Sequence, residues 1–140
     1  MLKRGLLCLL AIVVVWVAAD LVLHDFFLAP LYAQNPTLWR PMREMNVPLI
    51  HAVRFGLAAL FVVIYALQIR PKGLRVGLLF GLLMGLLLGV AVGIGTYIHS
   101  PIAPALMWGW FAGAIVKSTL AGALLGGMLK ESPTLPLPPG

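Results

Sequence analysis

Three charged side chains lie well inside long apolar stretches of the 140-residue chain, away from their ends: Asp20, Arg54 and Lys117. A charge in a membrane-spanning helix costs about 2.5–3.5 kcal/mol on insertion scales, so each of them needs a partner or a purpose. With a rise of about 1.5 Å per residue, Asp20 lies roughly 6–10 Å below the outer end of its helix and Arg54 about 9 Å below the outer end of the next one. The matching depths predict an Asp20–Arg54 ion pair.

Lys117 lies deeper, roughly 20 Å from the outer end of its own helix at the same rise, and so near the middle of a bilayer. The chain has no acidic residue at that depth. Because a lysine side chain can extend several ångströms along a helix, one interpretation is that its ammonium reaches Asp20 or a loop carbonyl. The others are a neutral lysine, a lipid headgroup or anionic substrate, and an acid on another subunit.

Three histidines, His24, His51 and His99, lie at the outer ends of three different helices. Neutral imidazole is a common ligand for transition metals and haem iron, and neighbouring thioethers would favour copper(I). The histidines therefore predict a metal or haem site as one alternative. The other is hydrogen bonding at the membrane surface, because no histidine pair has the HxxxH or HExxH spacing of a metal-binding helix. The thioethers concerned are those of Met42, Met45 and Met107.

Sequence motifs of catalysis are missing from the chain. There is no GxSxG, no CxxC, no glycine-rich phosphate loop after a strand and no pair of carboxylates, so we do not expect an enzyme. The net charge is +6, but no run of Lys and Arg alternates with aromatic residues, so we expect no nucleic-acid partner. The single cysteine, Cys8, cannot form an internal disulfide.

Four apolar stretches must position these residues, at 5–27, 48–69, 76–98 and 104–129. Each has about the 20 residues that a helix needs to cross a bilayer core of about 30 Å. Hydrocarbon offers the backbone no other hydrogen-bond partner, so the stretches must be helical. With 61% hydrophobic and only 10% charged residues, the chain predicts an all-α, antiparallel four-helix transmembrane bundle in a lipid bilayer. This domain covers residues 1–131, and the proline-rich residues 132–140 predict an extended, disordered tail.

Basic residues between the helices predict the orientation of the bundle. One side carries six of them and the other only Arg40 and Arg43, which places both termini in the cytoplasm of a bacterial inner membrane. The first apolar stretch would also suit a signal peptide cleaved before Asp20, but its length favours an uncleaved helix. The six basic residues are Lys3, Arg4, Arg70, Lys72, Arg75 and Lys130.

Small residues recur every fourth position along the third and fourth stretches. Such rows let helix backbones approach closely in a membrane, where no hydrophobic force drives association. One interpretation is that these two helices pack on each other within the chain. The other is that one row faces a second copy or another membrane subunit. The first row is Gly73, Gly77, Gly81, Gly85, Gly89 and Gly93, and the second is Ala105, Gly109, Gly113, Lys117 and Ala121.

The whole-chain pattern resembles small uncharacterised bacterial inner-membrane proteins of four helices that are grouped under domains of unknown function. The resemblance implies the four-helix architecture and no activity. The residues that carry it are Asp20, His24, Trp39-Arg40-Pro41, Gly95-Thr96-Tyr97, Pro101, Trp108 and the stretch from Lys117 to Gly122.

Two functions follow from these features. The first is a non-enzymatic membrane component that associates with itself or belongs to a larger membrane complex, with a polar cluster at its outer face. The alternative is a small transporter or a metal- or haem-binding membrane protein that uses His24, His51 and His99.

Overall fold

The computed structural model describes residues 2–129, and these residues contain four helices long and apolar enough to cross a membrane. The spans are Leu2–Phe27, Val47–Gln68, Leu74–His99 and Pro104–Met128, within a few residues of the predicted bounds. Between residues 2 and 129 no β-strand is present, so the all-α prediction is confirmed. Lys130 and the predicted tail lie outside the described residues.

Two of the spans change from α- to π-helix along their length. The first consists of α1 (Leu2–Asp20) and a π-helical segment, η1 (Leu21–Phe27). The third consists of α4 (Leu74–Gly89), a π-helical segment, η4 (Val90–Ile94), and α5 (Gly95–His99). The other two, α3 (Val47–Gln68) and α6 (Pro104–Met128), are uninterrupted α-helices.

Proline and asparagine mark the helix starts, as expected for the first turn, which leaves backbone N–H groups without a helical partner. The Asn46 side chain caps α3 by accepting a hydrogen bond of 3.0 Å from the backbone N–H of Leu49. Pro48 and Pro104 each stand in the first turn of their helix. The connection between η1 and α3 is partly helical, with α2 (Ala29–Ala33) and two short 3-10 turns.

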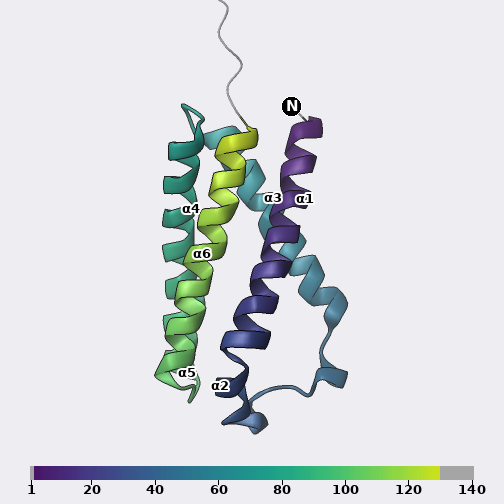
Figure 1. The fold of residues 1–140 in the computed structure, drawn as a ribbon, viewed down its shortest axis with the longest axis vertical. Coiled ribbons are helices and arrows are strands. Elements are labelled where there is room, and N and C mark those ends of the chain that lie inside the picture. The colour runs from purple at the N-terminus through teal and green to yellow at the C-terminus, as the bar shows by residue number, and fades with distance from the viewer. Residues whose placement is uncertain (1, 130–140) are drawn as a thin grey trace, which may run out of the picture.

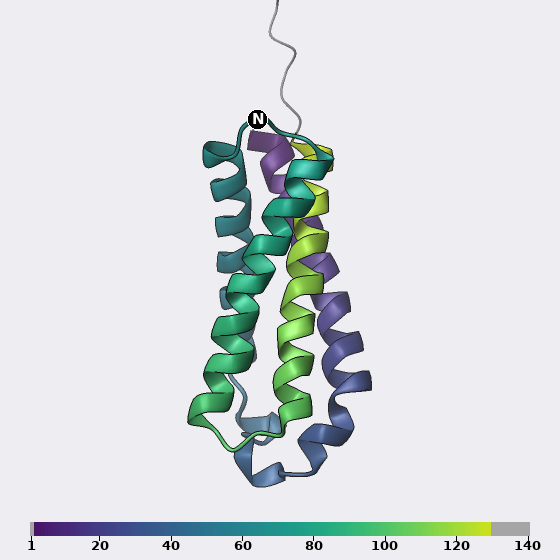
Figure 2. The ribbon, with the colours of Figure 1, turned by 90° about the vertical axis from the view of Figure 1, so that its left-hand side faces the viewer.

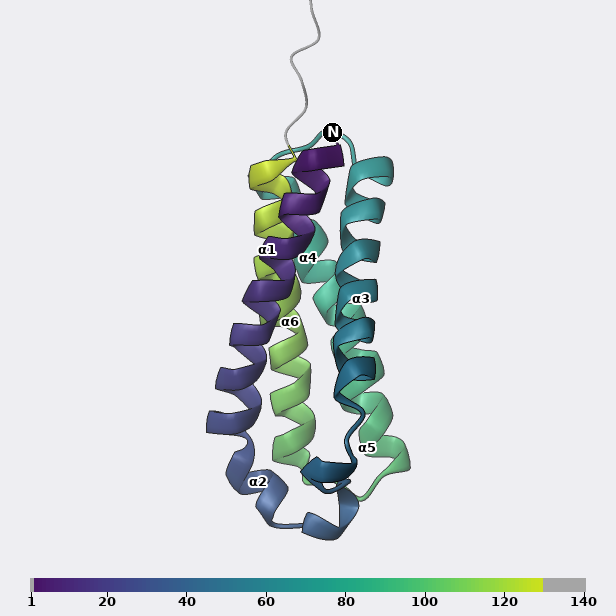
Figure 3. The same ribbon diagram turned by 90° about the vertical axis from the view of Figure 1, so that its right-hand side faces the viewer.

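The four spans run antiparallel, so the N-terminus and the last turn of α6 lie at one end, and α2 and α5 lie at the other (Figure 1). Helix α4 and its continuation through η4 and α5 lie beside α6 (Figure 2), and α1 packs on both α6 and α3 (Figure 3). Helices α3 and α4 meet near the N-terminal end, where the ring of Phe80 contacts those of Phe61 and Tyr65. They separate toward the α2 end.

The glycine row of the third span packs against α6 of the same chain, which confirms the first of the two interpretations. A Cβ added at Gly85 would lie 2.7 Å from the Cα of Ile115, and one at Gly93 would lie 2.9 Å from the carbonyl oxygen of Met107. Contacts this close exist only because the glycines have no side chain. Within this row only Gly73, which precedes α4, has open space where a Cβ would be.

The two glycines of the predicted second row do not face α4, and this part of the prediction was wrong. Gly113 faces the side chain of Leu23 in the first span, and Gly109 faces that of Leu28, which directly follows this span. The row that faces α4 lies on another side of α6. Because α6 touches two neighbours at once, it presents a different face to each, and a single four-residue period describes only one of these faces. The row toward α4 contains Met107, Phe111, Ile115, Ser118, Gly122 and Gly126.

Candidate functional site

Asp20, Arg54 and Lys117 meet in one network, with the Asp20 carboxylate at its centre. Nη2 of Arg54 donates a hydrogen bond of 3.0 Å to Oδ2, and Nζ of Lys117 donates to Oδ1. The ion pair predicted from depth is therefore confirmed, and Lys117 reaches the same acid. The three side chains are only 22%, 15% and 25% exposed in this order, so both ion pairs are largely shielded.

Local structure brings these groups to one level although their backbones differ in depth. Asp20 is the last residue of α1, immediately before the π-helical segment. The indole Nε1 of Trp16, one turn earlier, donates a hydrogen bond of 2.9 Å to the backbone carbonyl of Lys117 and so fixes α1 against α6. The lysine side chain then extends along its helix to the carboxylate, as long cationic side chains do in membranes.

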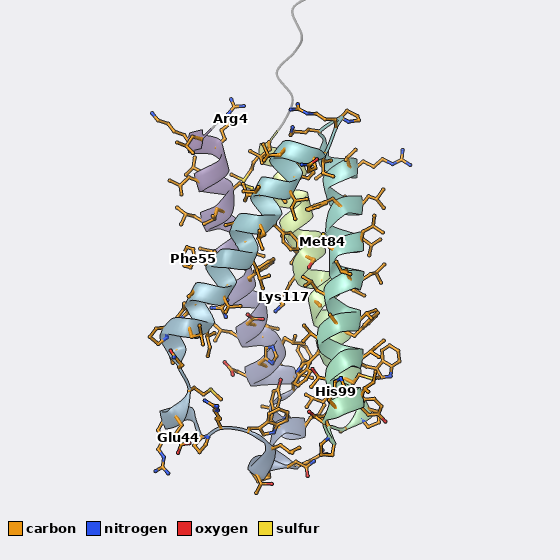
Figure 4. All side chains as sticks on the ribbon, turned by 180° about the vertical axis from the view of Figure 1, so that it is seen from behind. Arg4, Glu44, Phe55, Met84, His99 and Lys117 are labelled. Atoms are coloured by element: carbon orange, nitrogen blue, oxygen red, sulfur yellow. The ribbon has the colours of Figure 1, made fainter. Side chains whose placement is uncertain are left out.

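A cavity of about 340 Å³ surrounds the network, at the lower end of the range of roughly 300–1,000 Å³ found for small-molecule sites. Its charged walls are one carboxylate and two cations, which leaves one positive charge in excess. Most of the remaining wall is apolar, with side chains from all four spans. Figure 4 shows Lys117 in the space between the diverging α3 and α4. The apolar walls include Leu23, Ile50, Val53, Leu57, Leu88 and Val92.

A hydrogen-bonded aromatic cluster, His24, Tyr32, Trp39 and Trp110, lies beside the cavity at its α2 end. The Tyr32 hydroxyl accepts a bond of 2.7 Å from Nε1 of Trp110, which leaves its own proton for Nδ1 of His24 at 2.6 Å. The indole of Trp39 donates to the Tyr32 carbonyl at 3.2 Å and packs edge-on against the rings of Tyr32 and Trp110. Burial raises the pKa of Tyr32, so the hydroxyl stays protonated to higher pH than usual.

The three histidines take separate positions and partners. Nε2 of His24 lies 3.9 Å from the Asp20 carboxylate, while Nδ1 of His51 accepts a bond of 3.0 Å from Arg54. His99 is exposed at the end of α5. Within the described part of the chain, no group of three or more His, Cys, Asp or Glu side chains is placed to hold a metal ion. Of the predicted thioethers, the side chain of Met42 lies outside what the structure describes.

Sequence reasoning missed the roles of Tyr32, Trp16 and Trp110. Trp110 turns inward and donates a hydrogen bond to Tyr32, whereas Trp108, two residues earlier, is exposed. Both π-helical segments also border the cavity, through His24 on η1 and Val92 on η4. Such wider turns are frequent at functional sites, and no periodicity in the sequence announces them.

Comparison of the chain with protein-family models, with curated proteins and with solved structures found no match. The resemblance to small four-helix inner-membrane proteins therefore stays a prediction.

Proposed function

We propose that this chain is a non-enzymatic, multi-pass protein of the bacterial inner membrane that binds an anionic ligand in the cavity around Asp20, Arg54 and Lys117. Four helices long and apolar enough to span a bilayer support the membrane location. The basic residues of the sequence support an orientation with both termini in the cytoplasm, which puts the α2 end outside.

The excess positive charge of the cavity is the observation that carries this proposal. Asp20 can neutralise one of the two cations that it contacts, but not both. A charge in an apolar membrane interior is costly by about 2.5–3.5 kcal/mol, so an uncompensated cation there favours any anion that can reach it. Arg54 and Lys117 together offer several N–H donors around one space, and charge-assisted bonds to an oxyanion are the strongest that such donors form.

A small transporter is the second function that the same cavity supports, since intramembrane ionisable residues often mark the pathway of a substrate. Binding is the step that both functions share. Association with other subunits draws no support from the α4 glycine row, because α6 of the same chain covers it. A partner on another surface stays a prediction.

Thermal unfolding of the purified protein in an uncharged detergent tests the proposal. Octanesulfonate, a singly charged anion, should raise the unfolding free energy by about 2.7 kcal/mol at a concentration of 100 times its Kd. Octanol and octyltrimethylammonium, which have the same tail with no charge or a positive charge, should not stabilise the protein.

Two variants that each lose one positive charge test whether octanesulfonate stabilises the protein by binding in the cavity. Lys117→Gln removes the excess charge from the cavity and should abolish the stabilisation by octanesulfonate. Arg43→Gln removes a charge from a side chain that is 85% exposed and should leave it unchanged. Equal stabilisation of both variants, or equal effects of all three additives on the wild type, would show that the cavity does not select an anion.

A further inference from the structure

The cavity is shielded at its α2 end. The aromatic cluster His24, Tyr32, Trp39 and Trp110 lies there, joined by the two bonds of the Tyr32 hydroxyl and the bond from Trp39. Two of its members, His24 and Trp110, are themselves cavity walls. A ligand that arrived from water at this end would have to separate these bonded rings first.

The cavity has a less obstructed side, between α3 and α4. The two helices contact each other through Phe61, Tyr65 and Phe80 near the N-terminal end and diverge below that level (Figures 1 and 4). Cavity walls on both sides of this gap are also exposed on the outside of the molecule. Val53 on α3 is 53% exposed and Val92 on η4 is 50% exposed. Side chains that line a cavity and also face outward mark its mouth.

This mouth opens toward lipid and not toward water, because both of its rims belong to membrane-spanning helices. A molecule that enters there must itself be dissolved in the bilayer and so needs an apolar tail. The walls behind the mouth are mostly apolar, and the charged network lies among them. The single excess positive charge matches one negative charge on the head group.

We infer that the cavity takes a lipid with a singly negative head group, admitted sideways between α3 and α4 from the leaflet next to the α2 end. Its oxyanion lies at Lys117 and Arg54, and its acyl chain leaves through the mouth past Val53 and Val92. This inference rests on the proposed function, that the cavity binds an anion. A phosphodiester lipid and a fatty acid share this chemistry, and the experiment below separates them.

Trp16 is a suitable reporter for the occupant because it is a cavity wall, yet only 6% of it is exposed. Bromine atoms on an acyl chain quench a tryptophan on contact, so bulk lipid should quench Trp16 little. The full chain is reconstituted in phosphatidylcholine vesicles that contain increasing fractions of brominated phosphatidylglycerol, brominated phosphatidylcholine or brominated fatty acid. The difference between the wild type and Trp16→Phe isolates the Trp16 signal from that of the other tryptophans.

Brominated phosphatidylglycerol or brominated fatty acid should quench Trp16 with an affinity about tenfold above that of brominated phosphatidylcholine, the ratio expected from one charge-assisted hydrogen bond. Whichever of the two is preferred identifies the source of the anion. Lys117→Gln should remove the preference and Arg43→Gln should keep it. Equal quenching by the charged and the zwitterionic lipid would overturn the inference.

Narrowing the mouth tests the route. Val53→Phe and Val92→Phe should each reduce the quenching of Trp16 severalfold. Val63→Phe is the matched control, because Val63 lies on the same helix as Val53, is similarly exposed at 48% and does not line the cavity. Circular dichroism of each variant verifies that the helices are intact, and Val53→Ala, which widens the mouth, should quench at least as well as the wild type. Unchanged quenching in both narrowed variants would refute the lateral route.

The two proposals fail separately. If octanesulfonate stabilises the protein through Lys117 but no brominated lipid quenches Trp16 selectively, the anion site exists and the lipid inference is wrong. If neither octanesulfonate nor a charged lipid binds, both are wrong.

Discussion

Removal of the Asp20 carboxylate should destabilise the protein more than removal of either of its cationic partners. Asp20→Asn leaves Arg54 and Lys117 facing each other without a counter-ion, whereas Lys117→Gln leaves the Asp20–Arg54 pair intact. The three groups are 15–25% exposed, so the energetics lie between those of a surface pair and a fully buried one.

Breaking a buried pair by removing one partner costs about 3–5 kcal/mol, and the partial exposure here places Asp20→Asn near the lower end, at about 3 kcal/mol. Lys117→Gln loses one hydrogen bond to a charged group and should cost about 1.5 kcal/mol. In the double variant Asp20→Asn/Lys117→Gln one of the two uncompensated cations is also gone. We therefore expect a total cost below the sum of the single costs by about 1–2 kcal/mol, within the range for contacting residues.

Equilibrium unfolding in mixed micelles, followed by circular dichroism as the fraction of dodecyl sulfate rises, measures these free energies. Asp25→Asn is the matched control, because it makes the same chemical change at an exposed position five residues along the same span. It should alter the unfolding free energy by less than about 0.5 kcal/mol, as surface substitutions do. Equal losses for Asp20→Asn and Asp25→Asn, or strictly additive losses in the double variant, would refute the view of Asp20 as the shared counter-ion.

Three further predictions concern packing, the aromatic cluster and topology. Gly85→Ala places a Cβ 2.7 Å from a backbone carbon of α6 and should cost about 1–3 kcal/mol in the same assay, whereas Gly56→Ala, with no atom within 4 Å, should be neutral or stabilise by about 0.5–1 kcal/mol. Tyr32→Phe should weaken the fall in stability as pH rises above 10. The folded state holds the Tyr32 proton more tightly than the unfolded state, so the wild type gains stability from it below its ordinary pKa of 10.0 and loses this gain as pH rises through the higher folded pKa. If the unfolding free energy fell equally with pH in both proteins, or fell in neither, the Tyr32 hydroxyl would not be buried as described. Reporter fusions after Arg75 and at the C-terminus should report cytoplasm and one after Met42 the outside, and a periplasmic signal from either of the first two would reverse the orientation.

The sequence by itself determined the number and the type of the spans, and their bounds to within three residues. This was possible because helix formation in hydrocarbon is dictated locally: about 20 apolar residues must satisfy their own backbone hydrogen bonds, whatever surrounds them. The Asp20–Arg54 pair followed from the same physics, since a fixed rise per residue converts sequence position into depth. Depth also showed that Lys117 needed a partner, but it left Asp20 as one of several.

Only the tertiary structure decided which groups at one depth face each other. Rotation of a helix about its axis and its order in the bundle depend on long-range packing. The equal depths of His24, His51 and His99 therefore did not make them a metal-binding group: His24 and His51 contact Asp20 and Arg54, and His99 is exposed. For the same reason the four-residue period correctly predicted the face of α4 that packs on α6, but not the face of α6 that packs on α4. The cavity between the diverging α3 and α4 and the hydrogen bond from Trp110 to Tyr32 both depend on contacts between segments distant in sequence, which no local pattern encodes.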